Sequence, residues 1–410
     1  MTAAFAILVG FLLSNMPSPV YPVWQDQMGF SASTTTVLFA VYQAGVLVGL
    51  VGIGRLSDRI GWRPMLAGSM ATTAAAALMF AVAPGPAWLL AARALSGLSV
   101  GVVASCGSAA VTAEQERRGR DNGPLIASVV TSMGLAFGPL LGGIGVDLNP
   151  NPAQSAFVLE FAFALLMVVF IVSGMRTLAI ASSPRATAAE EVGLEDIGGV
   201  RTPARAMLTA ATPIATAGIV CAIYMSVGSG FIRDALDVTS GTVGGLLVFV
   251  VFASAFTGQL VFRAVEPGVQ GMVSMGASIG AAILLVAGLV VGSVAVLFVS
   301  AALSGVSQGL AQTAGYTIAR RVNPLVRLRG AYAWLNFASY LFGGGFVLLT
   351  GVLLTGLSLV AVTVTVGTLV CLMAVVGIGM LVRNRDEIAV REVVAATQVA
   401  ATMEPQPDRG

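Results

Sequence analysis

The sequence predicts an all-α membrane protein with twelve transmembrane helices, on three observations. Of its 410 residues, 57% are hydrophobic and 10% are charged, with a mean hydropathy of +0.91, whereas soluble domains carry about 25% charged residues. About a dozen apolar runs each approach the roughly 20 helical residues that cross a bilayer core. Short polar loops separate these runs, and the basic residues gather in every second loop.

The apolar runs give the expected spans in chain order. The first run contains Pro17, Pro19 and Pro22 and lacks both a basic leader and a small-residue cleavage site, which predicts a broken membrane helix rather than a cleaved signal peptide. The twelve expected spans cover residues 4–24, 33–54, 64–83, 87–110, 123–146, 155–176, 207–229, 240–262, 270–291, 294–318, 330–351 and 356–382.

The arginines indicate the orientation. All 21 basic residues are arginines, and 19 of them lie in loops after even-numbered spans or in the tail. The positive-inside rule therefore places these loops and both termini in the cytoplasm. Arg233, in an outer loop, and Arg93, within a span, are the two others. The use of arginine in place of every lysine is typical of a GC-rich bacterial gene. We therefore expect the protein to lie in the cytoplasmic membrane of a bacterium.

One long polar stretch divides the chain into halves of similar length. It contains four acidic residues and two arginines between Pro184 and Pro203. We expect an N-terminal six-helix bundle in residues 1–176, a cytoplasmic linker in 177–206, a C-terminal six-helix bundle in 207–382 and a disordered cytoplasmic tail in 383–410.

The two halves resemble each other in three places that occur in the same order. The matched pairs are Ala94–Gly101 with Ala302–Gly309, Gly54–Arg59 with Gly258–Arg263, and Phe137–Gly138 with Phe342–Gly343. Chance similarity among small residues is a serious explanation for one such match, but a much weaker one for three in register. The pattern predicts a duplicated six-helix unit, with a binding site near the midplane between the repeats.

Composition excludes several classes of protein. The arginines form no basic stripe with interleaved aromatic residues, which argues against nucleic-acid binding. Cys106, Cys221 and Cys371 fall in separate predicted helices without metal-ligand spacing, and the chain has no histidine. We therefore expect no metal and no cofactor, and an intramembrane enzyme is disfavoured because it would need a constellation of catalytic side chains.

The charged segment between the second and third spans, which we call the gate segment, points to a family. Residues Gly54-x-Leu56-x-Asp58-Arg59-x-Gly61-x-Arg63 resemble the corresponding loop of the major facilitator superfamily, whose members are twelve-helix secondary transporters. The resemblance implies two pseudo-symmetric six-helix bundles, the major facilitator fold. It also implies that Asp58 and Arg59 join the halves on the cytoplasmic side in the outward-facing state.

The resemblance suggests partners for the gate segment and shows two departures. The partners it implies are the N-terminus of helix 11 and Glu114 or Glu116. Trp62 stands where the family usually has a second basic residue, and Phe262 replaces the acidic residue in the second half. We therefore expect an asymmetric cytoplasmic contact.

Two ionisable residues lie deep within predicted spans. Arg93 begins the pattern Arg93-x-x-x-Gly97-x-x-x-Gly101, which resembles the helix-4 motif of proton-coupled drug exporters, where the arginine is linked to proton movement. Glu160 lies at a similar depth in the sixth span. Intramembrane ionisable groups are functional by default, so we expect Arg93 and Glu160 to couple transport to protons. The competing interpretations are a snorkelling arginine and a structural hydrogen bond made by the glutamate.

The fifth span carries a glycine-rich segment with one proline. Its residues Gly134-x-x-x-Gly138-Pro139-x-x-Gly142-Gly143 resemble the antiporter motif of drug:proton exchangers. The glycines lie one turn apart, so a neighbouring helix can pack closely, and Pro139 removes one helical hydrogen bond. Leu125 stands where the family pattern adds a further glycine. This segment favours export over import.

The family resemblance also implies a substrate cavity lined by helices 1, 4, 7 and 10, with helices 2 and 11 beside them. The candidate lining residues are Asn15, Tyr21, Tyr42, Gln43, Arg93, Tyr224, Gln308, Gln312, Tyr316, Tyr332, Trp334, Asn336 and Tyr340. Amide and aromatic groups with few charges suit a neutral or cationic amphipathic molecule. Asp26, Asp147, Asp234 and Asp237 lie at outer helix ends, where we expect solvated boundary residues.

These observations predict a secondary transporter in the lipid bilayer that works by alternating access. We expect proton-driven export of a small amphipathic or drug-like compound by antiport, with the proton gradient as the energy source and a monomer as the working unit. The alternative is proton-coupled uptake of a metabolite such as a sugar or an organic acid. A receptor or sensor built on the same fold also stays open.

Overall fold

The protein is entirely helical in the part that the computed structural model describes. That part comprises residues 2–116, 118–120, 123–148, 152–178, 204–236, 238–323 and 325–384. Within it, twelve helical segments are long and apolar enough to cross a membrane, as the sequence predicts. The expected tail beyond Asn384 and most of the expected linker lie outside the described residues.

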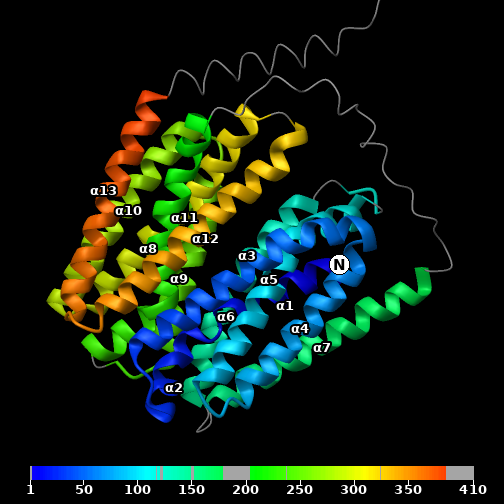
Figure 1. Cartoon of the computed structure of the whole chain (residues 1–410), viewed down its shortest axis with the longest axis horizontal. Helices are drawn as coiled ribbons and strands as arrows, with labels where there is room; N and C mark the ends of the chain where they lie inside the picture. The colour runs from blue at the N-terminus through cyan, green and yellow to red at the C-terminus, as the bar shows by residue number, and fades with distance from the viewer. Residues whose placement is uncertain are drawn as a thin grey trace, which may run out of the picture.

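The helices follow one another with short connections (Figure 1). The N-terminal half contains α1 (Thr2–Asn15), the 3-10 turn η1 (Ser18–Val20), α2 (Tyr21–Met28), α3 (Ala32–Ile60), α4 (Trp62–Ala81), α5 (Pro86–Glu116), α6 (Gly123–Leu148) and α7 (Pro152–Leu178). The C-terminal half contains α8 (Ala204–Leu236), α9 (Gly241–Val261), α10 (Pro267–Val291), α11 (Val294–Val322), α12 (Leu325–Leu353) and α13 (Leu359–Arg383).

The first span is broken where its prolines lie. Helix α1 ends at Asn15, η1 carries the chain past Pro17 and Pro19, and α2 completes the span. Proline has no backbone N–H, so it cannot donate the hydrogen bond that would continue the helix. The interruption therefore leaves backbone carbonyl groups of α1 available to other partners.

The gate segment is helical rather than a loop, which corrects the boundary expected from the sequence. Helix α3 continues to Ile60, six residues past the predicted end, and α4 begins at Trp62. A helix satisfies its own backbone hydrogen bonds, so it can extend from the bilayer into water without loss. Gly61 alone makes the turn, with a φ of 83° that favours glycine.

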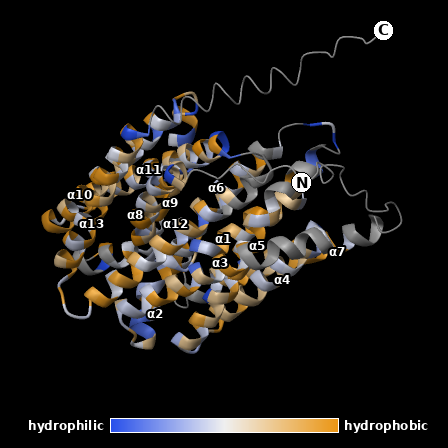
Figure 2. Ribbon diagram, turned by 45° about the horizontal axis from the view of Figure 1, so that its top comes forward, coloured by the Kyte–Doolittle hydropathy of each residue, from blue (hydrophilic) through white to orange (hydrophobic). Residues whose placement is uncertain are grey.

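The surface of the bundle is suited to a lipid environment. Figure 2 shows hydrophobic residues along the lengths of the helices and hydrophilic residues concentrated near their ends. Large apolar side chains are exposed on peripheral helices, among them Phe163 and Phe170 on α7 and Leu372 and Val376 on α13. Such continuous apolar exposure is rare in soluble monomers and normal for a helix that contacts acyl chains.

The internal repeat is visible in packing as well as in sequence. On α5, a Cβ added to Gly97 or Gly101 would overlap backbone atoms of α3, and on α11 one added to Gly305 or Gly309 would overlap those of α9. These four glycines occupy matched positions in the sequence repeat. Both halves therefore use the same close helix crossing, which glycine permits because it has no side chain.

A matched pair of serines makes the same hydrogen bonds in both halves. Ser99 donates to the Ser69 carbonyl at 2.8 Å and lies 2.6 Å from the Thr73 hydroxyl. Its counterpart Ser307 donates to the Ser274 carbonyl at 2.9 Å and lies 2.6 Å from the hydroxyl of Ser278. The pseudo-symmetry thus extends to individual side chains.

Within the described residues, the two halves meet along several helix pairs, including α2 against α8. Helix α6 packs against α9, α3 packs against α12 and α8, and η1 lies against both α8 and α9. We call the end where α1 begins and α13 finishes the arginine-rich end, and the other the opposite end. Hydrogen bonds and ion pairs recorded between the halves, among the residues described, cluster toward the opposite end. The halves are therefore closed together there.

Candidate functional site

Arg93 is fully buried and holds the broken part of the first span. Its side chain is 0% exposed on α5. Its Nη1 donates to the carbonyl oxygen of Ser14 at 2.7 Å, and its Nε donates to the Tyr21 hydroxyl. These two acceptors lie on either side of the break, in α1 and α2. The snorkelling interpretation therefore does not describe this arginine, which turns inward.

Aromatic rings complete the surroundings of the guanidinium group. Its central carbon lies 5.1 Å from the ring centre of Tyr21, 5.2 Å from that of Tyr42 and 5.7 Å from that of Phe80. Ring faces attract a cation, and the attraction is strongest where water is excluded. One donor nitrogen, Nη2 of Arg93, is nevertheless buried without a hydrogen-bond partner in the structure.

Glu160 is also buried, but it does not pair with Arg93 here. It is 1% exposed on α7, and its Oε1 atom has no hydrogen-bond partner in the structure. Phe157 lies one turn away on the same helix, with its ring centre 5.1 Å from that of Phe80, which in turn faces Arg93. Two stacked rings, those of Phe157 and Phe80, thus extend from the turn of α7 next to Glu160 to the guanidinium group of Arg93.

A central cavity of about 130 Å³ lies between the halves. Its lining contains seven of the candidate cavity residues, namely Asn15, Tyr42, Gln43, Gln308, Gln312, Asn336 and Tyr340. Apolar and small residues that the sequence did not single out complete it, including Phe11, Phe39, Met225, Phe252 and Ser339. None of these described lining residues is charged. Periodicity did not reveal the added residues, because apolar side chains fill every face of these helices.

Three other candidate tyrosines make contacts elsewhere. Tyr21 is bonded to Arg93, as described above. The Tyr224 hydroxyl lies 2.5 Å from that of Ser300, which joins α8 to α11 inside the C-terminal half. Tyr316 donates to the side-chain carbonyl of Asn336 at 2.7 Å, so it holds the side chain of a residue that lines the cavity.

The glycine-rich segment of α6 faces two different partners. A Cβ added to Gly134 or Gly138 would meet the backbone of α1, and one added to Gly142 would meet the backbone of Met16 just after α1, within the same half. Gly143 instead lies against the backbone of Gly241 on α9, and a Cβ on Gly245 would overlap the carbonyl of Pro139. The segment therefore packs the first span on one face and the other half of the protein on the other.

Asp147 extends this second face by one helical turn, and it corrects an expectation. Its carboxylate accepts hydrogen bonds from the backbone N–H of Gly241 at 2.7 Å, from that of Thr242 at 3.0 Å and from the Ser240 hydroxyl at 2.8 Å. A carboxylate at a helix N-terminus is favoured by the unpaired N–H groups there. The residue lies at the boundary as expected, but it joins the two halves. The sequence indicated this role only through spacing: Asp147 lies four residues, or about one helical turn, after Gly143 and so faces the same side of α6.

Asp26 is exposed at the boundary as expected, but it also contacts the other half. It forms an ion pair with Arg233, which links α2 in the N-terminal half to α8 in the C-terminal half. The ion pair is exposed, so its contribution is modest. Asp234 and Asp237 lie outside the side chains that the structure describes.

We expect the substitution Asp147→Ala to weaken closure of the opposite end. Loss of a charged helix cap costs up to about 2 kcal/mol, so the ratio of closed to open conformers should fall by about 5- to 30-fold. The measurement is the rate at which a polar thiol reagent modifies Ser226→Cys, a site on α8 that is buried between the halves at this end, in protein lacking native cysteines. Glu266→Ala, which removes an exposed carboxylate, is the control, and equal rates in both variants would contradict the prediction.

The gate segment is described only in part. The positions of Gly54, Asp58 and Arg59 are described for the backbone only. The expected contact of Asp58 and Arg59 with the other half therefore stays a prediction. Arg63 stacks over the ring of Trp62, with 5.1 Å between its central carbon and the ring centre. The tryptophan that replaces a basic residue therefore contacts the neighbouring arginine.

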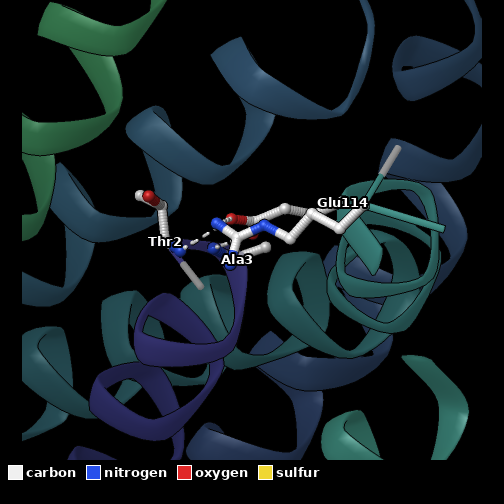
Figure 3. Close-up of polar contacts among 4 residues, drawn as sticks. Thr2, Ala3 and Glu114 are labelled. Carbon is white, nitrogen blue, oxygen red and sulfur yellow. Dashed lines mark hydrogen bonds and ion pairs between the residues drawn. The ribbon is translucent and has the colours of Figure 1, made fainter. Parts of the chain in front are cut away.

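Glu114, an implied partner of the gate segment, makes contacts at the start of α1. Its two carboxylate oxygens accept hydrogen bonds from the backbone N–H groups of Thr2 and Ala3, each at 3.2 Å (Figure 3). It also forms an ion pair with Arg118 at 3.2 Å. A carboxylate at this helix N-terminus stabilises the first turn and joins α1 to α5 near the gate segment.

The fold and the seams between the halves define a membrane carrier built from two repeats around a central cavity. A sequence model described as Major Facilitator Superfamily matches residues 3–348. That range is most of the chain, so the chain belongs to the major facilitator superfamily, a family of secondary transporters and not of enzymes.

Relatives among characterised proteins match part of the chain. Major facilitator superfamily domain-containing protein 10 of Bos taurus is 28% identical over 186 residues, which is 42% of this chain and 39% of that protein. The quinolone resistance protein NorA of Staphylococcus aureus (strain MRSA252) is 25% identical over 171 residues, which is 41% of this chain and 42% of that protein. The matches thus span about two fifths of each relative.

Solved structures agree with the fold over nearly the whole chain. A mutant of the nucleoside transporter NupG superposes with a TM-score of 0.73 at 11% identity, covering 92% of this chain and 98% of that one. A bacterial homolog of the human lysosomal transporter Spinster superposes with a TM-score of 0.65 at 15% identity, covering 97% and 94%. At these identities the similarity establishes the fold alone.

Proposed function

We propose that this transporter exports a small neutral or cationic amphipathic compound in exchange for protons. The observation that carries the proposal is the position of Arg93, a buried cation bonded to both sides of the break in the first span. Charged groups at such depth are costly and are retained where they carry ions or bind ligands. The likeness of one segment to NorA, which is named for quinolone resistance, supports the direction and the type of cargo.

The first span connects Arg93 to the rest of the mechanism. Asn15 lines the central cavity beside Ser14, whose carbonyl Arg93 holds. Three residues further along, the Ser18 hydroxyl donates to the Met225 carbonyl of the other half at 2.7 Å. A change in what Arg93 binds would therefore act on both the cavity and the seam. Tyr42 adds a direct link, because its ring faces Arg93 and also lines the cavity.

Glu160 is the proposed proton carrier. An unpaired carboxylate is costly in an apolar setting, so we assign the neutral, protonated form to the conformation described here. Loss of that proton would leave a negative charge in the same half as Arg93, whose Nη2 also lacks a partner in this structure. Movement of Arg93 toward Glu160 would release the first span. Through this change of partner by Arg93, proton transfer at Glu160 would alter the contact between the halves.

The central cavity supports the class of substrate. Its lining residues are amides, aromatic rings and apolar side chains without charge. The side-chain oxygens of Gln43 and Gln308 are buried without a hydrogen-bond partner in the structure. Such acceptors favour a cargo that brings N–H or O–H donors. An anionic or phosphorylated cargo would find no matching cation there.

By the positive-inside rule the opposite end is the outer end, so the structure is closed toward the outside. The halves would separate there to release the cargo. Residues of the gate segment would then come together at the arginine-rich, cytoplasmic end. The proposal thus assigns the described structure to the cytoplasm-facing half of the cycle.

The direction of transport is tested in inside-out membrane vesicles with ethidium as a cationic amphipathic probe. An acidic lumen should drive ethidium accumulation if the protein exchanges protons for cargo. Proton-coupled uptake, the alternative, predicts no accumulation in these vesicles and gradient-driven entry into intact cells. A panel of neutral and cationic compounds, read out by proton release, extends the test beyond one probe.

We expect Glu160→Gln to abolish gradient-driven accumulation while exchange of labelled for unlabelled cargo persists without a gradient. Glutamine keeps the size and the hydrogen-bonding oxygen of Glu160 but cannot carry a proton. Glu266→Gln, at an exposed position on the start of α10, is the matched control and should behave as wild type. Undiminished accumulation by Glu160→Gln would remove this residue from the coupling site.

A further inference from the structure

A second cavity lies at the opposite end of the bundle, between the halves. Its volume is about 240 Å³, against about 130 Å³ for the central cavity. We call it the outer pocket, and it is lined by Tyr21, Pro22, Gln25, Ala32, Thr35, Ser226, Val227, Gly230, Leu354 and Leu359. The first five belong to the N-terminal half and the last five to the C-terminal half. Its walls therefore come together only when the halves are closed at this end.

A thin partition separates the outer pocket from the central cavity. Met225 lines the central cavity and the next residue, Ser226, lines the outer pocket. The Ser18 hydroxyl donates to the carbonyl of Met225 at 2.7 Å, so this part of α8 is held against the N-terminal half. The outer pocket is thus a separate space beyond the central site.

The chemistry of the lining selects the occupant. The apolar walls consist of Pro22, Val227, Leu354 and Leu359. No residue of the lining described above is charged. Hydrogen-bonding groups are present in both walls, with Ser226 on one side and, on the other, Gln25, which donates to the Thr35 hydroxyl at 2.9 Å. An apolar protein cavity of about 150 Å³ holds benzene. The outer pocket therefore has room for one or two fused rings.

We propose that the outer pocket is a second ligand site, for a compact neutral molecule of one or two rings with a hydrogen-bonding group, which when bound holds the outer end closed. A ligand shifts a conformational equilibrium by its difference in affinity for the two states. Both walls exist together only in the closed state, so the occupant binds that state. Its effect on transport rests on the proposed function, whereas its binding and its effect on conformation do not.

Indole is a suitable probe, because it is neutral, has a two-ring system and carries one N–H donor. Its binding to the purified protein is measured by equilibrium dialysis, and closure by the distance between spin labels at Ala91→Cys and Val291→Cys, two exposed positions at the outer ends of α5 and α10. We expect one saturable site and a severalfold increase in the closed population. Tryptamine, a cation, and indole-3-acetate, an anion, should bind at least tenfold more weakly.

Two substitutions that fill the pocket from opposite walls locate the site. Ala32→Phe and Leu354→Trp should each weaken indole binding at least tenfold, so a folding defect in one leaves the other as a test. Ala75→Phe, on an exposed face of α4, is the control for added volume. Gln308→Leu alters the central cavity and should leave indole binding unchanged. Indole binding that survives both filling substitutions, or that Gln308→Leu abolishes, would overturn the proposal.

The outcomes separate this proposal from the proposed function. Indole binding and closure without proton-coupled export of any compound would retain the outer pocket and reject the exporter. Proton-coupled export with a conformational equilibrium that indole leaves unchanged would retain the exporter and reject the outer pocket. Equal binding of the charged analogues would also reject the ligand class proposed here.

Discussion

The substitution Arg93→Leu is expected to lower gradient-driven transport by about 100-fold or more. It removes a buried cation that bonds to the Tyr21 hydroxyl and to the Ser14 carbonyl at 2.7 Å. Each buried acceptor that loses its partner costs about 1–3 kcal/mol, and each 1.4 kcal/mol is tenfold. The first span would lose the side chain that joins α1 to α2 across the break.

Arg93→Lys tests whether charge alone suffices. Lysine is a single cationic group and cannot reproduce the planar fork that reaches both acceptors at once. We therefore expect it to recover a minor part of the transport lost in Arg93→Leu. Ethidium accumulation in inside-out vesicles measures both variants, with thermal unfolding in detergent to confirm that they fold.

The exposed residue Arg320 provides the control, since Arg320→Leu removes the same charge from the surface of α11. Transport by Arg320→Leu should stay within a few-fold of wild type. If Arg93→Leu transported as well as Arg320→Leu, Arg93 would have a structural role only. Proton coupling would then have to depend on a residue other than Arg93.

The second large effect is expected at Gly143, where a single methyl group should open the opposite end. A Cβ at this position would overlap the carbonyl oxygen of Gly241 on α9, and both sides of that contact are backbone. Overpacking costs about 1–3 kcal/mol, which corresponds to about 5- to 150-fold in the ratio of closed to open conformers. Gly143→Ala should therefore shift the distance between spin labels at Ala91→Cys and Val291→Cys toward longer values.

Gly138→Ala distinguishes this effect from general destabilisation. The same methyl group there would overlap the carbonyl of Leu12 on α1, inside the N-terminal half. We expect a lower unfolding temperature in detergent without a shift in the spin-label distances. Gly68→Ala adds a methyl group where nothing lies within 4 Å and should change neither measurement. A shift in Gly138→Ala equal to that in Gly143→Ala would contradict the division of the α6 segment into two faces.

The glycine-rich segment shows how far a motif can be read from sequence. Its spacing predicted close packing of α6, and the structure shows that packing. It did not reveal which helices Gly138 and Gly143 contact, because helical periodicity sets the direction that each residue faces but not the neighbour that lies in that direction. Asp147 was underestimated for the same reason. Its role depends on the N-terminus of α9, about ninety residues later in the chain.

The sequence predicted some residues of the central cavity correctly and misplaced others, and the difference depends on the chemistry of the side chains. Amide side chains such as Gln308 and Asn336 line the cavity as expected, because buried amides in apolar helices favour polar or interior faces. Tyr224 was expected there and instead contacts Ser300. A tyrosine can bury its ring and satisfy its hydroxyl with any nearby acceptor, so its position in a helix does not specify its partner.

The sequence by itself determined the number of spans, the helical class, the repeat and the family resemblance. Each of these follows from hydropathy or from residues close together in the chain, since a bilayer requires long apolar helices with internally satisfied hydrogen bonds. Only the tertiary structure decided that Arg93 holds the break in the first span, that Asp147 joins the halves and that an outer pocket exists. These features depend on atoms from distant helices, whose relative rotation and depth are fixed by packing and leave no periodic trace in the sequence.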